Sequence, residues 1–185
     1  DALPRNHIGT VLSLADKLET LVVLFGIGQL PTGDKDPFAL RRHALGVIRI
    51  LTEKNLPLDL PALLQAALPA FGDLLTDPTE ALLGFFADRL AVSLRDQGYS
   101  AQEVDAVLAL APTRLGDVPR RLAAVRAFAE LPEAPALAAA NKRVSNILKK
   151  SLGADAHVNP ALLKEPAEQA LHAAMLQVVP AADAQ

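Results

Sequence analysis

Apolar residues recur at intervals of three and four along most of the chain, which is the spacing of amphipathic α-helices. The first such run covers residues 8–25 and places on one face Val11, Leu14, Leu18, Leu21, Val22 and Phe25. Leucine and alanine, both strong helix formers, are abundant throughout. No stretch combines sustained period-two alternation with hairpin turn signals. The pattern predicts an all-α protein.

Cap residues and prolines predict where the helices of the first half begin. Asp36 followed by Pro37 combines an N-cap with a proline at the first helical position, so a second helix is expected from there to about residue 54. Asp59 is the expected cap of a third helix, over residues 60–68. Two more helices, ending near residues 97 and 110, begin at pairs with the spacing of a capping box, Asp77 with Glu80 and Ser100 with Glu103.

The second half contains the same kinds of helix start and stop signals. Pro119 after Asp117 predicts a helix that ends near residue 131, residues 136–152 predict another, and Asn159 before Pro160 predicts a last helix to about residue 179. About eight helices joined by short loops predict one or two helical bundles. The Pro- and Gly-rich stretch at residues 68–78 is the expected boundary, which divides the chain into residues 1–72 and 73–185.

Composition removes several classes of site. The 185 residues are 51% apolar, carry a formal charge of −3 and include no cysteine, so disulfides, thiolate zinc sites and cysteine nucleophiles are excluded. No apolar run approaches the ~20 residues that span a bilayer. The four histidines lack metal-binding spacings, and no phosphate-binding glycine loop or nucleophile elbow is present. The expectation is a chain with no catalytic residue, metal or cofactor of its own.

Basic residues gather on one side of the helix expected at residues 136–152. The pairs Lys142 with Lys149 and Arg143 with Lys150 are each seven residues apart, about 20° around a helix, and Asn146 lies between the two rows. The opposite face is apolar and is expected to be buried, with Leu137, Ala140, Val144, Ile147 and Leu148. This basic stripe is predicted either to be a solvated face or to contact a polyanion.

A second basic group lies at the beginning of the helix expected after residue 37. Arg42 and Arg49 share a face there, and Arg41 lies near the N-terminus, where the helix dipole slightly disfavours a cation. Arg49 has an alternative partner in Glu53 at i+4. Arg41 or Arg42 either clamps Asp34 or Asp36 of the preceding loop or contacts RNA. A third basic group is interrupted by Asp117 and is weaker evidence for a binding surface. It consists of Arg114, Arg120, Arg121 and Arg126.

Two parts of the sequence are similar to one known family. LADKLETL at residues 14–21, FGIG at 25–28, PTGDKDPFALRR at 31–42 and ALGVIRIL at 44–51 closely resemble the β subunit of the bacterial two-subunit glycyl-tRNA synthetase. AAANKRVSNIL at residues 138–148 resembles a helix of that subunit's C-terminal anticodon-binding bundle. The resemblance covers essentially the whole chain and identifies it as a C-terminal fragment of such a subunit.

The resemblance implies a cytoplasmic enzyme in which an α subunit holds the ATP, magnesium and glycine site and the β subunit mainly holds tRNA(Gly). It implies that residues 1–72 end a domain similar to the HD metal-phosphohydrolases and that residues 73–185 begin an anticodon-binding domain whose final part is missing. Asp16 matches the last HD metal ligand, but the other ligands would precede residue 1, so no hydrolase activity carries over. The expected partners are tRNA(Gly), the α subunit and the rest of the β subunit, with no membrane.

Pattern and resemblance together predict that the basic residues bind backbone phosphates of tRNA. The predicted tRNA-binding residues are Arg41, Arg42, Arg49, Lys142, Arg143, Asn146, Lys149 and Lys150. Tyr99 is the one tyrosine and tryptophan is absent, so stacking platforms for bases are scarce. Asn146 is the candidate base reader, with a water-bonded surface amide as the alternative. The alternative function is a structural or subunit-interaction module with few RNA contacts.

Overall fold

The computed structural model describes residues 2–150 and 158–183. These residues form α-helices and short 3-10 helices and contain no β-strand, so the predicted all-α class is confirmed. An isolated antiparallel bridge joins Thr32 to Lys35 in a loop. The chain divides into two compact units, residues 1–134 and residues 135–185, which are described separately below.

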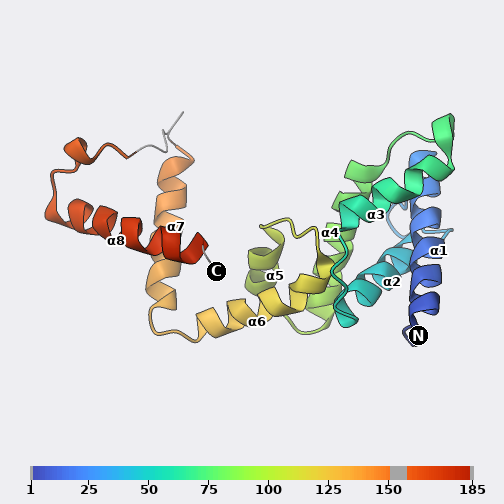
Figure 1. Ribbon diagram of the computed structural model, residues 1–185, viewed down its shortest axis with the longest axis horizontal. Helices are drawn as coiled ribbons and strands as arrows, with labels where there is room; N and C mark the ends of the chain where they lie inside the picture. Colours follow the sequence, from blue (N-terminus) through green and yellow to red (C-terminus); the bar gives the residue numbers. More distant parts are fainter. Residues whose placement is uncertain (1, 151–157, 184–185) are drawn as a thin grey trace. The chain divides into compact units, whose positions relative to one another are not determined.

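The first helix, α1 (His7–Gly26), follows the sequence prediction closely (Figure 1). Asn6 caps it, because its side-chain oxygen accepts a hydrogen bond of 2.8 Å from the backbone N–H of Gly9. Val11, however, is 66% exposed, although the periodicity placed it in the core. Thr10 takes the buried position in this turn instead, with its hydroxyl donating to the carbonyl of Asn6 at 2.9 Å.

The second helix, α2 (Leu40–Glu53), begins three residues later than the Asp36–Pro37 pair predicted. Asp36 still caps it, but from outside the helix, since its carboxylate accepts from the backbone N–H groups of Leu40 at 2.8 Å and Arg41 at 3.0 Å. Ala39 makes the connection in the left-handed region, with φ of 54°. Proline at residue 37 therefore belongs to the turn before the helix and not to its first turn.

Two of the other predicted caps form as expected. The Asp59 carboxylate accepts from the backbone of Ala62 at 3.0 Å and begins α3 (Leu60–Ala67). Ser100 and Glu103 form a complete capping box at α5 (Ala101–Leu108). The box predicted at Asp77 and Glu80 is absent from α4 (Thr79–Asp96), because the Asp77 carboxylate turns onto the N–H of Thr79 at 2.8 Å. Helix α6 (Val118–Ala129) follows a 3-10 turn, Leu115–Asp117.

One hydrophobic core runs through the first unit. Helix α1 packs against α2, α3 and α4, α2 also packs against α4, and α5 packs against α4 and α6. The core cluster joins residues before and after residue 72, such as Leu21 and Leu51 with Leu82 and Phe86. The two compact units divide after residue 134. The assignment of the two sides to HD-like and anticodon-binding domains stays a prediction.

The second unit contains most of α7 (Ala134–Leu148), a 3-10 turn (Pro160–Leu162) and α8 (Pro166–Asp183). The helix predicted to begin at Asn159 begins at Pro166, because Asn159 caps only the short turn, accepting from Ala161 at 3.1 Å. The predicted end of α7 near Gly153 lies outside the described residues. Its apolar side was expected to be buried, but the exposed fractions lie between 52% and 55% for Leu137, Val144, Ile147 and Leu148.

Candidate nucleic-acid interface

The basic stripe of α7 forms one surface of the second unit. Four of its five members, together with Ala139 and Ile147, border a shallow hollow of about 540 Å³, namely Lys142, Arg143, Asn146 and Lys150. Lys149 lies one residue beyond the end of the helix and is exposed like the others. Lys142, Arg143, Asn146 and Lys150 therefore lie together at one hollow, as the periodicity predicted, whereas Lys149 does not line it.

The charges of this stripe are not neutralised within the part of the chain that the structure describes. None of the ion pairs there includes Lys142, Arg143, Lys149 or Lys150. The backbone N–H groups of Lys149 and Lys150 donate to the carbonyls of Ser145 and Ile147, both at 3.0 Å, so the last turn of α7 ends among these cations. Cations at a helix C-terminus are favourable, because they face the negative end of its dipole.

The second basic group, on α2, is held by local contacts. The Arg41 guanidinium donates to the carbonyl of Gly33, so it ties the preceding loop to the helix. The alternative in which Arg41 pairs with Asp36 is wrong, because the Asp36 carboxylate binds backbone N–H groups. Arg49 donates from Nε to the Glu53 carboxylate at 2.6 Å, as its i+4 spacing suggested. The hydrogen bond to Glu53 and its negative charge raise the pKa of Arg49 above its ordinary value.

Arg42 is the member of this group with the fewest local contacts. It is exposed, it forms no ion pair in residues 2–150 and 158–183, and it borders a hollow between α1 and α2. Of the three arginines predicted on α2, Arg42 is therefore the one whose guanidinium is available to a ligand. The α2 group and the α7 stripe belong to different compact units.

The third basic group is largely structural. Arg126 donates from Nε to Glu103 at 2.5 Å and lies over the ring of Tyr99, with its guanidinium carbon 4.3 Å from the ring centre. This hydrogen bond is the largest cause that lowers the pKa of Glu103 to about 2, with help from Ser100. Arg120 pairs with Asp117 at 3.4 Å. Sequence reasoning missed the pair Arg126–Glu103, since its members are 23 residues apart and no local signal joins them.

Asp16 is the residue that the resemblance matches to an HD metal ligand. The Asp16 side chain is 65% exposed and lies 3.8 Å from the Lys17 ammonium. Within the described residues, no group of three or more histidine or carboxylate side chains is placed to hold a metal ion.

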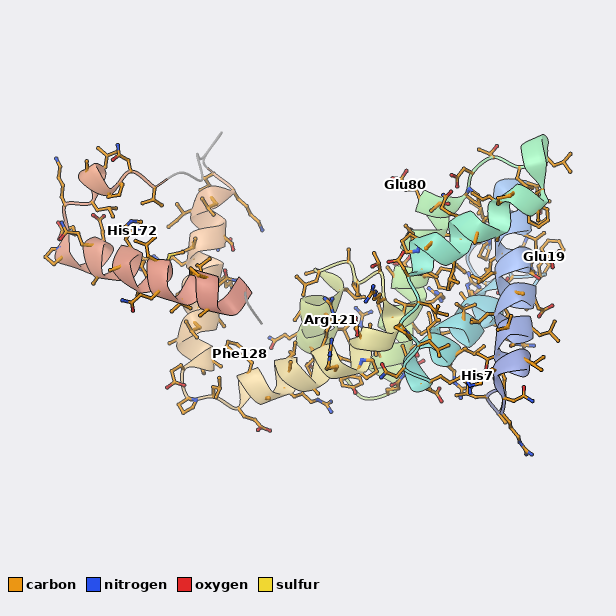
Figure 2. The ribbon with its side chains drawn as sticks, viewed as in Figure 1. His7, Glu19, Glu80, Arg121, Phe128 and His172 are labelled. Carbon is orange, nitrogen blue, oxygen red and sulfur yellow. The ribbon has the colours of Figure 1, made fainter. Side chains whose placement is uncertain are left out.

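Acidic side chains also mark the surface of the first unit, as Glu19 on α1 and Glu80 at the beginning of α4 show in Figure 2. The basic patches are therefore local features of a surface of mixed charge, in keeping with the net charge of −3. Among the residues described, no helix has both the length and the apolar character that crossing a membrane requires.

Comparison with known proteins decides the family. Residues 1–109 match the family model described as the glycyl-tRNA synthetase beta subunit. The chain belongs to this family. The match crosses residue 72, so it includes the basic group of α2, the capping box of Ser100 and Glu103, and most of the core that joins them.

Curated relatives agree along the full chain. The glycine–tRNA ligase beta subunits of Leptothrix cholodnii, Paracidovorax citrulli and Polaromonas naphthalenivorans are 78%, 71% and 71% identical, and each alignment covers all of this chain. The chain spans 26% of the length of each of these relatives. The resemblance seen in the sequence is thus confirmed, and the relatives extend it over α7 and α8, which lie beyond the matched residues of the family model.

Proposed function

We propose that this chain is a tRNA-binding part of glycine–tRNA ligase. In this proposal it holds tRNA(Gly) in the cytoplasm while the α subunit, with ATP and magnesium, attaches glycine, and the rest of the β subunit completes the assembly. The chain itself supplies no reacting group or cofactor. The relatives named as beta subunits of the ligase support the role in aminoacylation, and the surface of α7 supports the RNA contact.

The basic stripe is the observation that carries the proposal. Its four cations are exposed and have no carboxylate partner in the described residues, and three of them, Lys142, Arg143 and Lys150, border one hollow. Unpaired surface cations repel one another and contribute little to folding, so their clustering fits a polyanionic ligand. Lys and Arg side chains bind phosphate oxygens and release counterions, which makes the affinity depend on salt.

In this proposal, Asn146 and the planar guanidinium groups of arginine side chains recognise the bases of the RNA. Tyr99 lies under Arg126, and Phe25 packs on Phe85 with ring centres 5.0 Å apart, so neither aromatic pair is open to a base. Asn146 is exposed beside Arg143 and Lys150 at the hollow of α7. Its amide both donates and accepts hydrogen bonds, as the edge of an unstacked base requires.

A filter-binding titration of the chain with tRNA(Gly) tests the proposal. Replacing Lys142, Arg143 and Lys150 with alanine is expected to weaken binding at least tenfold at low salt. The matched control removes three exposed cations of the first unit, Arg95, Arg114 and Arg120, and is expected to change affinity by less than threefold. Equal losses in both triple variants, or no binding by the unaltered chain, would contradict the proposal.

A second candidate function is an interaction module that braces the enzyme. The observation that favours it is the exposed apolar side of α7, together with a similar set on α8, Leu171, Met175, Leu176, Val178 and Val179. Apolar side chains grouped in this way are typical of protein contact surfaces. Co-purification of the chain with the α subunit, or with the rest of the β subunit, in the absence of RNA would favour this function. Binding to tRNA alone, with neither protein captured, would contradict it.

A further inference from the structure

A hollow of about 510 Å³ lies between the segment before α1, helix α1 and helix α2. Its volume is in the range of small-ligand pockets. The part of its wall that matters here is formed by Leu3, Pro4, Lys17, Arg42, His43 and Leu45. Of the described residues that line it, none is acidic and several are basic, so the hollow is positively charged and suits an anion.

Lys17 reaches this hollow because α2 carries a glycine where the lysine crosses it. A Cβ on Gly46 would lie 2.7 Å from Cε and 2.9 Å from Cδ of Lys17, so a side chain there would have to push the lysine stem aside. The ammonium donates to the hydroxyl of Ser13 at 3.1 Å, and the side chain is 25% exposed. An ammonium carries three hydrogens, so this bond leaves donors for a ligand.

The charge of Lys17 is only partly balanced by its neighbour. The Asp16 carboxylate is 3.8 Å from the ammonium and is itself mostly exposed, so solvent screens the pair. Arg42 adds a second cation that has no ion-pair partner among the described residues. Arg49 also borders the hollow, but its guanidinium binds Glu53 and is not required here.

His43 lines the same hollow as Lys17 and Arg42. Its Nδ1 atom is buried and has no hydrogen-bond partner in the structure described, and because a buried atom offers no surface to the hollow we assign it no contact with a ligand.

We propose that this hollow binds a nucleotide, with its phosphate held by Lys17 and Arg42. A phosphate offers several strong acceptor oxygens and suits both an ammonium and a guanidinium. The apolar side chains of Leu3, Pro4 and Leu45 form the rest of the wall and provide a surface for a base. The nucleotide is either free or a terminal nucleotide of a bound RNA, and in the second case this inference rests on the proposed function.

Isothermal titration of the 185-residue chain with AMP, inorganic phosphate and adenosine tests the ligand class. AMP and phosphate are expected to bind, and adenosine is expected to bind at least tenfold more weakly than AMP, because the charged hydrogen bonds go to the phosphate. Adenosine binding as tightly as AMP would overturn the inference. No measurable heat with AMP at millimolar concentration would overturn it as well.

Two variants change the site in different ways. Lys17→Met keeps the packed stem and removes the charge, whereas Gly46→Ala keeps every charge and displaces the stem. Each is expected to weaken AMP binding at least tenfold, with the helical circular dichroism of the unaltered chain retained. Lys54→Met removes a cation at the end of α2 outside the hollow and is expected to leave affinity within twofold. If Gly46→Ala fails to fold, unchanged AMP affinity in Lys17→Met still overturns the inference.

Competition distinguishes the two sources of the nucleotide. A fluorophore on the 3′ end of tRNA(Gly) reports whether AMP displaces that end from the chain. Displacement by AMP assigns the site to RNA, whereas simultaneous binding of AMP and tRNA assigns it to a free nucleotide. Retained tRNA binding with no AMP binding would overturn this inference alone. AMP binding that depends on Lys17, without any tRNA binding, would overturn the proposed function and leave the nucleotide site standing.

Discussion

Gly116 packs directly against the backbone of Leu56, so that a Cβ at residue 116 would lie 2.5 Å from the Leu56 carbonyl oxygen and 3.1 Å from its nitrogen. Backbone atoms cannot swing aside as the end of a flexible side chain can. This contact brings the turn before α6 against the segment between α2 and α3. The glycine is therefore required by a close approach between two segments about sixty residues apart in sequence.

Gly116→Ala is expected to lower the free energy of unfolding by about 1–3 kcal/mol, because the added methyl group must push one backbone away from the other. The matched control is Gly84→Ala. Gly84 is exposed on α4 with open space around the missing side chain, so alanine there is expected to stabilise by about 0.5–1 kcal/mol. Urea unfolding followed by circular dichroism measures both values. Stabilisation by both substitutions would show that the close approach does not exist.

Glu103 is expected to make the free energy of unfolding depend on pH in the acid range. Its pKa is about 2 in the folded chain, chiefly because Arg126 donates to its carboxylate, whereas the pKa of an unfolded glutamate is about 4.3. Since the folded pKa is the lower one, the contribution to stability is present above about pH 5 and is lost as the pH falls toward 2. Unfolding midpoints measured across this interval are expected to vary less with pH in Glu103→Gln. Glu19→Gln, which alters an exposed carboxylate on α1, is expected to leave the slope unchanged.

Asp36→Ala is expected to destabilise the first unit by about 1–2 kcal/mol. The carboxylate satisfies the backbone N–H groups of Leu40 and Arg41, and alanine leaves both without an acceptor. Asp34→Ala, in the same loop, removes an exposed acid and is expected to have almost no effect. Equal urea midpoints for the two variants would contradict the capping role of Asp36.

Ala39→Gly is expected to stabilise α2 by up to about 1 kcal/mol. Ala39 occupies the left-handed region with φ of 54°. A residue with a Cβ is strained in this conformation, whereas glycine adopts it without strain. Part of the gain is lost because glycine makes the unfolded chain more flexible. Thermal unfolding measures the sum, and a lower midpoint for the glycine variant would contradict strain at residue 39.

The basic stripe is expected to determine how tRNA binding depends on salt. Each phosphate contact contributes about 0.7–0.9 to the slope of log K against log salt concentration. Removing Lys142, Arg143 and Lys150 is therefore expected to reduce the slope by about 2–3 if each side chain contacts one phosphate. Filter-binding titrations at four salt concentrations measure the slope. An unchanged slope with weaker binding would show that the stripe supports the fold of α7 and not the RNA contact.

Local signals in the sequence predicted much of the secondary structure. The capping box of Ser100 and Glu103 and the cap at Asp59 formed as expected, since each depends on residues three positions apart. Asp36 shows the limit of such signals. It caps α2, but from a turn outside the helix, because the left-handed conformation of Ala39 cannot be inferred from an alanine.

The candidate sites also include one part that the sequence predicted and one part that it did not. The alignment of Lys142, Arg143, Asn146 and Lys150 on one face follows from the helical period alone and was predictable. The hollow between α1 and α2 was not predictable, because Lys17, Arg42 and His43 come from two helices and the passage over Gly46 depends on how those helices pack.

The order of residues in this chain determined by itself its helical class, most helix ends and the family to which it belongs, since these depend on local chemistry and on residue identity. Only the tertiary structure decided that one core runs past residue 72, that the apolar side of α7 is exposed, and that Arg126 binds Glu103. The physical reason is that burial and charge pairing depend on which surfaces meet. Helical periodicity orients a side chain around its own helix but does not say what lies opposite.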